Sequence, residues 1–227
     1  NLSVLSALEQ TAGRGQRGNS WHSAAGENLL FSIVLKYRKE GMRPNCLPPV
    51  RACDQFVISE TAALAVTDFL SGYGIRAKIK WPNDIMIHDK KVCGILTEAV
   101  TQFNTIENII IGVGIDVNMD ITNFPDELQA GTTTIADELG EKADENTLIR
   151  VFLEEFEKIG EVFLEDGIEE ILKEWRKRSY TIGKIVEVRA PFNKYYDAYV
   201  VGIGKEGALI VEKIDGTLEK VTSGECI

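Results

Sequence analysis

The sequence predicts an α+β protein with a larger N-terminal domain, residues 1–179, and a small β-rich domain, residues 180–227. Three observations predict this class. Apolar runs of strand length surround one helix-length segment in the first half of the chain. Two amphipathic helical stretches follow, with apolar side chains at i, i+3 and i+4 spacing. After Ser179 the chain changes to short β-rich runs separated by turns, a texture typical of a small barrel or sandwich.

Each element is justified by its apolar pattern and by the residues that end it. Strands of the larger domain are expected at 29–35, 77–81, 85–87, 92–100 and 108–119. Strands of the smaller domain are expected at 185–190, 196–203, 207–214 and 218–222. A helix over 54–70 is expected to pack on the sheet. Thr134 can cap a short helix, Asp144 starts a long one, and Gly167 separates it from another that runs through Arg178.

The composition excludes several classes of function. The chain has 227 residues and a formal net charge of −10, which argues against a broad nucleic-acid surface. No apolar run approaches the roughly 20 residues that a membrane span needs, and the first residues do not form a secretory signal. The four cysteines are Cys46, Cys53, Cys93 and Cys226. They show neither a CxxC pair nor zinc spacing, so we expect free thiols in a cytoplasmic protein.

The stretch QTAGRGQRGNSW, residues 10–21, concentrates glycine and positive charge in an acidic chain. Gly13, Gly15 and Gly18 can adopt positive φ, so that successive backbone N–H groups point into one concavity. Arg14 and Arg17 beside it would add donors suited to a carboxylate or a phosphate. The loop therefore predicts an anion site. The alternative is a solvated basic turn.

The stretch KWPND, residues 80–84, ends a predicted strand. Asn83 and Asp84 could bind a hydroxyl or a metal-bound phosphate, and Trp81 could form an apolar or stacking wall. In the alternative interpretation Asn-Asp initiates a turn and Trp81 is a packed residue.

Two further stretches suit a pocket. Lys91 enters a strand, where its ammonium can face a cleft and meet a carboxylate or phosphoryl oxygen. In GVGIDVN, Gly112 and Gly114 make room for a flat apolar ligand, and Asp116 and Asn118 follow. In the alternative interpretation Lys91 is solvated, and GVGIDVN is a core strand of a twisted sheet in which the glycines avoid crowding.

Taken in order, the signatures QTAGRGQRGNSW, GENLLFSI, KWPNDI, KVCGILTE, GVGIDVN and SGECI resemble those of biotin–protein ligases, also called biotin–acetyl-CoA-carboxylase ligases. The similarity spans essentially the whole chain, and the combination is far more specific than any one motif. It implies a mixed β-sheet flanked by helices, related to class II aminoacyl-tRNA synthetases. It also implies a C-terminal SH3-like β-barrel, in agreement with the change of texture at Ser179.

The resemblance implies a reaction. Biotin and ATP, with Mg²⁺, give biotinyl-5′-AMP and pyrophosphate, and a lysine of a biotin carboxyl carrier domain of a biotin-dependent carboxylase then takes the biotinyl group. Some relatives carry an N-terminal helix-turn-helix. None is found in this sequence, so we expect a ligase without DNA binding, present as a monomer or a homodimer.

The resemblance also implies roles for individual residues. Lys91, Arg14 and Asp84 are the expected catalytic residues. The expected binding residues for biotin and ATP are Gln10, Gly13, Arg14, Gly15, Gln16, Arg17, Gly18, Trp21, Lys80, Trp81, Asn83, Lys91, Gly94, Gly112, Gly114, Asp116 and Asn118. No residue is expected to be a resident metal ligand.

The sequence departs from the family pattern at three places. The Ser-Thr-Asn segment that contacts biotin is not found, so we expect it, with a first helix and strand, upstream of residue 1. Gln16 stands where some relatives carry arginine, and Asp116 stands where asparagine is usual. Two other functions stay open: a lipoate–protein ligase, and a non-catalytic module that binds biotin or a nucleotide.

Overall fold

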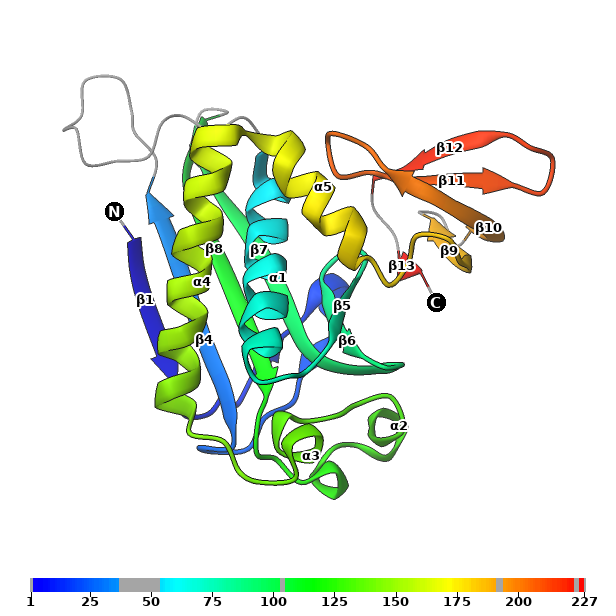
Figure 1. The fold of residues 1–227 in the computed structure, drawn as a ribbon. Coiled ribbons are helices and arrows are strands. Elements are labelled where there is room, and N and C mark those ends of the chain that lie inside the picture. The colour runs from blue at the N-terminus through cyan, green and yellow to red at the C-terminus, as the bar shows by residue number, and fades with distance from the viewer. Residues whose placement is uncertain (1, 37–53, 103–104, 191–193, 223–224, 227) are drawn as a thin grey trace.

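A computed structural model describes residues 2–36, 54–102, 105–190, 194–222 and 225–226 (Figure 1). Cys46, Cys53 and part of the closing SGECI signature lie outside these residues. Cys93 is buried and forms no disulfide with any residue that the structure describes. Within the described ranges, no helix is long and apolar enough to cross a membrane.

Six strands form the central sheet, in the order β1-β4-β8-β7-β6-β5. Their bounds are β1 Leu2–Ala7, β4 Asn28–Lys36, β5 Ala77–Lys80, β6 Asp84–Ile87, β7 Lys90–Gln102 and β8 Thr105–Asp116. Every neighbouring pair of these strands is antiparallel. In the described part of the chain, parallel pairing occurs at two isolated bridges, Ile79 with Ser179 and Lys91 with Thr132, so the arrangement is mixed. The expected hairpin of β6 and β7 is confirmed.

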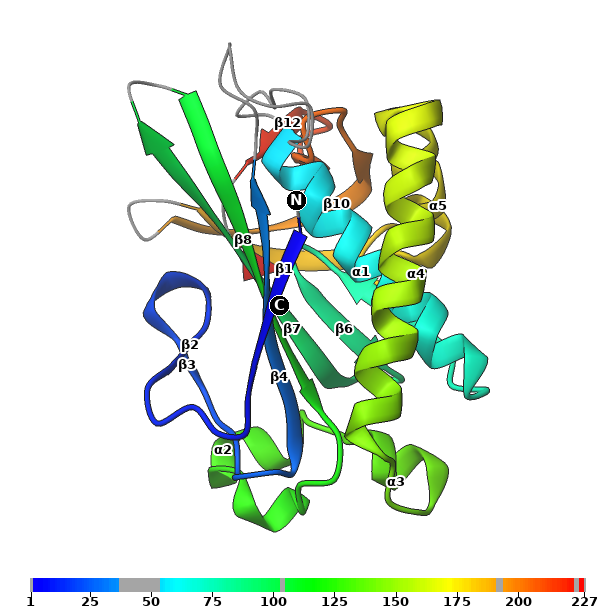
Figure 2. The same ribbon diagram turned by 90° about the vertical axis from the view of Figure 1, so that its left-hand side faces the viewer.

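Three helices cover one face of this sheet, and the glycine-rich loop lies on the other side (Figures 1 and 2). The helices are α1 Asp54–Gly72, α4 Glu145–Asp166 and α5 Ile168–Arg178. The loop contains the short strands β2 Gly13–Arg14 and β3 Ser20–Trp21. Apolar side chains from alternate positions of β7 and β8 pack against the helices, because successive strand residues face opposite sides of a sheet. The remaining side chains of these strands are left to face the loop.

The expected helix ends are confirmed. Asp144 accepts a hydrogen bond from the backbone N–H of Thr147 and so caps α4. Thr134 does the same for Asp137 at the start of the short helix α3, Ile135–Leu139. Gly167 ends α4 with φ of 81°, a conformation that favours glycine. The other short helices are α2 Asp126–Gln129 and the 3-10 turns η1 Gln16–Gly18 and η2 Ile121–Asn123.

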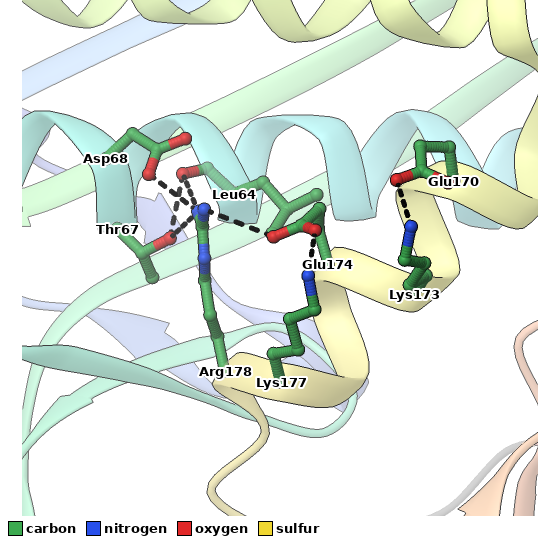
Figure 3. A network of polar contacts seen from close by, with 8 residues as sticks. All are labelled: Leu64, Thr67, Asp68, Glu170, Lys173, Glu174, Lys177 and Arg178. Carbon is green, nitrogen blue, oxygen red and sulfur yellow. Dashed lines mark hydrogen bonds and ion pairs between the residues drawn. The ribbon is translucent and has the colours of Figure 1, made fainter.

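A partly buried arginine, Arg178, joins α5 to α1 (Figure 3). Arg178 Nη1 lies 2.7 Å from Asp68 Oδ1 and donates to Thr67 Oγ1 at 2.9 Å. Glu174 of α5 adds a second carboxylate at 3.7 Å from Nη2. The two helices therefore form one unit through ion pairs as well as apolar packing.

The C-terminal residues form a five-stranded antiparallel sheet in the order β12-β11-β10-β9-β13. Its strands are β9 Ile185–Ala190, β10 Lys194–Ile203, β11 Leu209–Lys213, β12 Leu218–Val221 and β13 Glu225–Cys226. Among the described residues no pairing joins β12 to β13. The expected SH3-like β unit is confirmed, as an antiparallel sheet whose strand pairing does not close into a full barrel within the described residues.

Candidate active site

A cavity of about 230 Å³ lies between the glycine-rich loop and the sheet face that the helices leave free. Its floor comes from β4, β7 and β8, one wall from the loop of residues 10–21, and the opposite wall from residues 80–84. Segments far apart in the chain thus meet here.

The floor is a tryptophan lying on two glycines. Gly94 and Gly114 face each other across β7 and β8. A Cβ at Gly114 would lie 2.5 Å from Trp21 Cε2, and one at Gly94 would lie 3.0 Å from Trp21 Cζ3. The glycines therefore make room for Trp21, not directly for a ligand. The indole Nε1 of Trp21 is buried and has no hydrogen-bond partner within the described residues.

Lys91 is held at the edge of this floor. Its Nζ lies 2.7 Å from Asp84 Oδ1 and 5.7 Å from the centre of the Trp21 ring. Its backbone is fixed on the other side, where its N–H donates to Gly131 and its carbonyl accepts from Thr133. About a third of the side chain is exposed, at 34%. Lys91 therefore presents a pre-oriented cation to the cavity.

The loop folds over the cavity by its own hydrogen bonds. Gly13 pairs with Trp21, and the Gly15 N–H donates to Asn19 at 2.7 Å. Arg17 has a φ of 58°, an uncommon conformation for a residue with a side chain. Arg14 Nη2 reaches Glu98 Oε2 on β7 at 2.9 Å. Because this ion pair is largely exposed, it is weak. Arg14 can therefore leave Glu98 and pair with another anion.

The cavity brings together most of the predicted residues. They are Gln10, Arg14, Gly15, Gln16, Arg17, Trp21, Lys80, Trp81, Asn83, Asp84, Lys91, Gly94, Gly112 and Gly114. Gly13 and Gly18 line an adjoining hollow between the loop and β7.

Four predicted residues have other partners. Asn83 donates to the carbonyl of Ile95 at 2.6 Å. Trp81 Nε1 donates to the carbonyl of Gly207 in the C-terminal sheet. Asn118 exchanges hydrogen bonds with the backbone of Ala143 and lies outside the cavity. Asp116 is buried and also lies outside the lining of the cavity.

Sequence reasoning missed Glu98, Ser20 and Ser32, which also line the cavity. A signal for Glu98 was present. Gly94, Leu96 and Glu98 alternate along β7, so they share the cavity face of the sheet.

The buried carboxyl of Asp116 has an unusual pKa. Burial raises that pKa to about 8, although the Lys91 ammonium and a 2.8 Å hydrogen bond from Asn28 Nδ2 both lower it. The carboxyl is therefore protonated in the folded protein at neutral pH.

Replacing Asp116 by Asn is expected to flatten the pH dependence of stability between pH 5 and 8. In that window the unfolded carboxyl is ionised and the folded one is protonated, so the free energy of unfolding falls as pH rises, by up to about 1.4 kcal/mol per pH unit. Asparagine does not titrate and still accepts from Asn28. Thermal melts across this pH range measure the effect. The exposed Asp120→Asn is the control, and an unchanged slope in Asp116→Asn would contradict the assignment.

Comparison with known proteins decides the family. The profile of the biotin/lipoate A/B protein ligase family matches residues 1–116, which is just over half of the chain. The chain belongs to this family. A second profile, the biotin protein ligase C-terminal domain, matches residues 181–227.

Individual members of the family are similar over nearly the whole chain. The bifunctional ligase/repressor BirA of Bacillus subtilis (strain 168) is 34% identical over 223 residues, covering 98% of this chain and 65% of that protein. The biotin–[acetyl-CoA-carboxylase] ligase of Mycobacterium tuberculosis is 29% identical, covering 99% of this chain and 78% of that protein. The chain thus spans less than two thirds of the length of the first of these relatives.

Solved structures of the family share the fold. The biotin protein ligase from Aquifex aeolicus, in complex with biotin and ATP, superimposes with a TM-score of 0.79 at 24% identity. The match covers 99% of this chain and 87% of that chain. The α+β class with a small C-terminal β unit is confirmed by this likeness.

Proposed function

We propose that this chain is an ATP-dependent biotin–[acetyl-CoA-carboxylase] ligase, which makes biotinyl-5′-AMP and transfers biotin to a lysine of a carrier domain. The observation that carries the proposal is Lys91, paired with Asp84 beside an aromatic floor and facing the arginine-bearing loop. The names of the relatives support the same activity.

The first step needs the charges that the cavity provides. A carboxylate oxygen of biotin attacks the α-phosphorus of ATP, a P–O bond forms, and the bond to pyrophosphate breaks. Because both reactants are anions, cations must offset their repulsion. In this proposal Lys91 contacts the carboxylate and the α-phosphate. Its support is that Lys91 lines the cavity together with three other cations, Arg14, Arg17 and Lys80. The Trp21 ring, lying on Gly94 and Gly114, adds an apolar surface at the floor.

The second step needs little from the protein beyond orientation. The ε-amine of the carrier lysine attacks the acyl carbon, the bond from that carbon to the phosphate oxygen breaks, and AMP leaves. The amine loses a proton as the amide forms. Asp84 lines the cavity beside Lys91 and is placed to orient the incoming amine.

We assign Mg²⁺ to the nucleotide substrate. The described residues contain no cluster of three or more potential metal ligands. The cavity carboxylates Asp84 and Glu98 each pair with a cation. Mg²⁺ usually binds through one or two carboxylates and the substrate phosphates, so it suits this site as part of MgATP.

We also propose the partner, the compartment and the domain boundary. The partner is the biotin carrier domain of a carboxylase, and the reaction takes place in the cytoplasm. The boundary lies between residues 179 and 180, where α5 has ended and the match to the C-terminal profile is about to begin.

Arg14→Ala is expected to release the adenylate faster, by about tenfold or more, because a charge-assisted hydrogen bond contributes about 1.5–3 kcal/mol. Rapid dilution of preformed adenylate, followed by measurement of free biotinyl-AMP, gives the rate. Glu98→Gln is the matched control, since it removes the ion pair and keeps the arginine. Equal release from both variants would mean that the ion pair, not contact with the ligand, is what matters.

The function itself is tested by pyrophosphate exchange with biotin and lipoate in parallel, followed by mass spectrometry of a carrier domain incubated with MgATP and biotin. Exchange with biotin and a biotinyl mass on the carrier are expected. Exchange with lipoate alone would make this a lipoate–protein ligase. Binding of biotin without exchange or carrier modification would make it a binding module.

A further inference from the structure

Trp81 connects the cavity to the C-terminal sheet. Its backbone N–H donates to Thr181 Oγ1 at 3.0 Å, and its indole Nε1 donates to the carbonyl of Gly207, also at 3.0 Å. Just before it, the carbonyl of Ile79 accepts from the N–H of Tyr180 at 2.7 Å. Trp81 is only 3% exposed. One residue of the cavity wall is thus held, by its backbone and by its side chain, to residues 100 and 126 positions away in the sequence.

The acceptor carbonyl is itself held firmly. Gly207 closes a turn in which its N–H donates to Gly204 and the N–H of Gly204 donates to Ala208. Its φ of 79° favours glycine, and a Cβ there would lie 1.9 Å from the ring of Phe56 on α1. Arg176 of α5 also donates to Ile203, at the end of β10. The turn is therefore fixed by both α1 and α5.

Trp81 also lies close in sequence to the ion pair of Asp84 and Lys91. Residues 80–84 line the cavity as one short wall. Three positions after Trp81, Asp84 pairs with Lys91 at 2.7 Å. Between them, the carbonyl of Asn83 accepts from the N–H of Ile95 on β7. One short segment, residues 81–84, thus joins the contacts of Trp81 with the C-terminal part of the chain to the ion pair of Asp84 and Lys91.

We infer that Trp81 is a positioning residue through which the C-terminal sheet holds Asp84 against Lys91. The inference rests on the proposed function for its catalytic consequence. It assigns Trp81 a role different from the substrate wall expected from the sequence. Both of its N–H groups donate to residues of the C-terminal part of the chain, Thr181 and Gly207.

The test compares two tryptophans. Trp81→Phe keeps an aromatic ring but removes the indole donor. Trp175→Phe makes the same change at a fully buried indole whose Nε1 has no hydrogen-bond partner in the described part of the chain. Both variants replace a buried indole by a smaller phenyl ring, so both lose packing contacts. Their melting temperatures show how much of any effect comes from lower stability alone. If Trp81→Phe does not fold, Thr181→Val removes the other acceptor while keeping the shape of the side chain.

Two readouts follow. Hydrogen–deuterium exchange is expected to become about tenfold faster over residues 79–84 in Trp81→Phe and to stay unchanged there in Trp175→Phe. Pyrophosphate exchange is expected to lose kcat in Trp81→Phe, with the KM for biotin changed less, and to keep both parameters in Trp175→Phe.

The outcomes separate the two proposals. Unchanged hydrogen exchange at 79–84, or equal losses of kcat in the two variants, would overturn the role of Trp81. If the wild-type protein shows no pyrophosphate exchange, the proposed function is overturned instead. The hydrogen–deuterium exchange comparison would still decide whether Trp81 couples residues 79–84 to the C-terminal sheet.

Discussion

Lys91→Met is expected to reduce biotin-dependent pyrophosphate exchange by at least about 100-fold, the usual effect of removing one group that stabilises charge in a transition state. Methionine keeps an unbranched side chain and removes only the charge. The loss should appear in kcat, since Lys91, held by Asp84, would act on the negative charge that develops as the bond to pyrophosphate breaks. Initial rates of exchange at saturating biotin and ATP measure it.

Lys90→Met is the control for this prediction. Lys90 is the preceding residue, at the start of the same strand, and it is exposed. Its exchange rate should match that of the wild type. Activity retained in Lys91→Met, with a normal melting temperature, would show that Lys91 has a structural role in holding Asp84.

Gly114→Ala is expected to weaken biotin binding at least about tenfold, since overpacking typically costs about 1–3 kcal/mol. The new Cβ would lie 2.5 Å from the Trp21 ring, so the indole must leave its place on the sheet and the cavity loses its floor. Isothermal titration with biotin measures the affinity, and a crystal structure of the variant shows the ring.

Gly160→Ala is the control for this change. Gly160 lies in α4 and does not line the cavity, and a Cβ there would meet nothing within 4 Å. Biotin affinity should not change in this variant. Wild-type affinity in Gly114→Ala as well would mean that the position of Trp21 does not set the shape of the floor.

The fold could be predicted from the sequence where the pattern is local. The caps Thr134 and Asp144 and the break at Gly167 depend on a few neighbouring residues, and all lie where they were predicted. Strand direction is different. An apolar run such as 29–35 shows that a strand is buried but not which neighbour it pairs with, so the antiparallel pairing of the sheet needed the structure. The open end of the C-terminal sheet depends likewise on which strands meet.

The sequence predicts which segments form the site. It predicts the partners of single residues less well. The loop, Lys91 and Asp84 meet as expected, since each carries a charge or glycine pattern of its own. Asn118 has the same chemistry as a ligand-binding amide, yet its nearest partner is Ala143, 25 residues away. The space beside Gly114 is taken by Trp21, which no spacing along the chain reveals. Contacts between distant segments decide these cases.

The register that places Asn28 opposite Asp116 also affects how the chain folds during its synthesis. These partners in β4 and β8 are 88 residues apart. At typical rates of translation, β8 leaves the ribosome about 4 to 18 s after β4. Until then β4 can pair with β1 alone, and one of its edges has no partner. Completion of the sheet, and with it of the cavity floor, therefore waits for the last of its strands to be made.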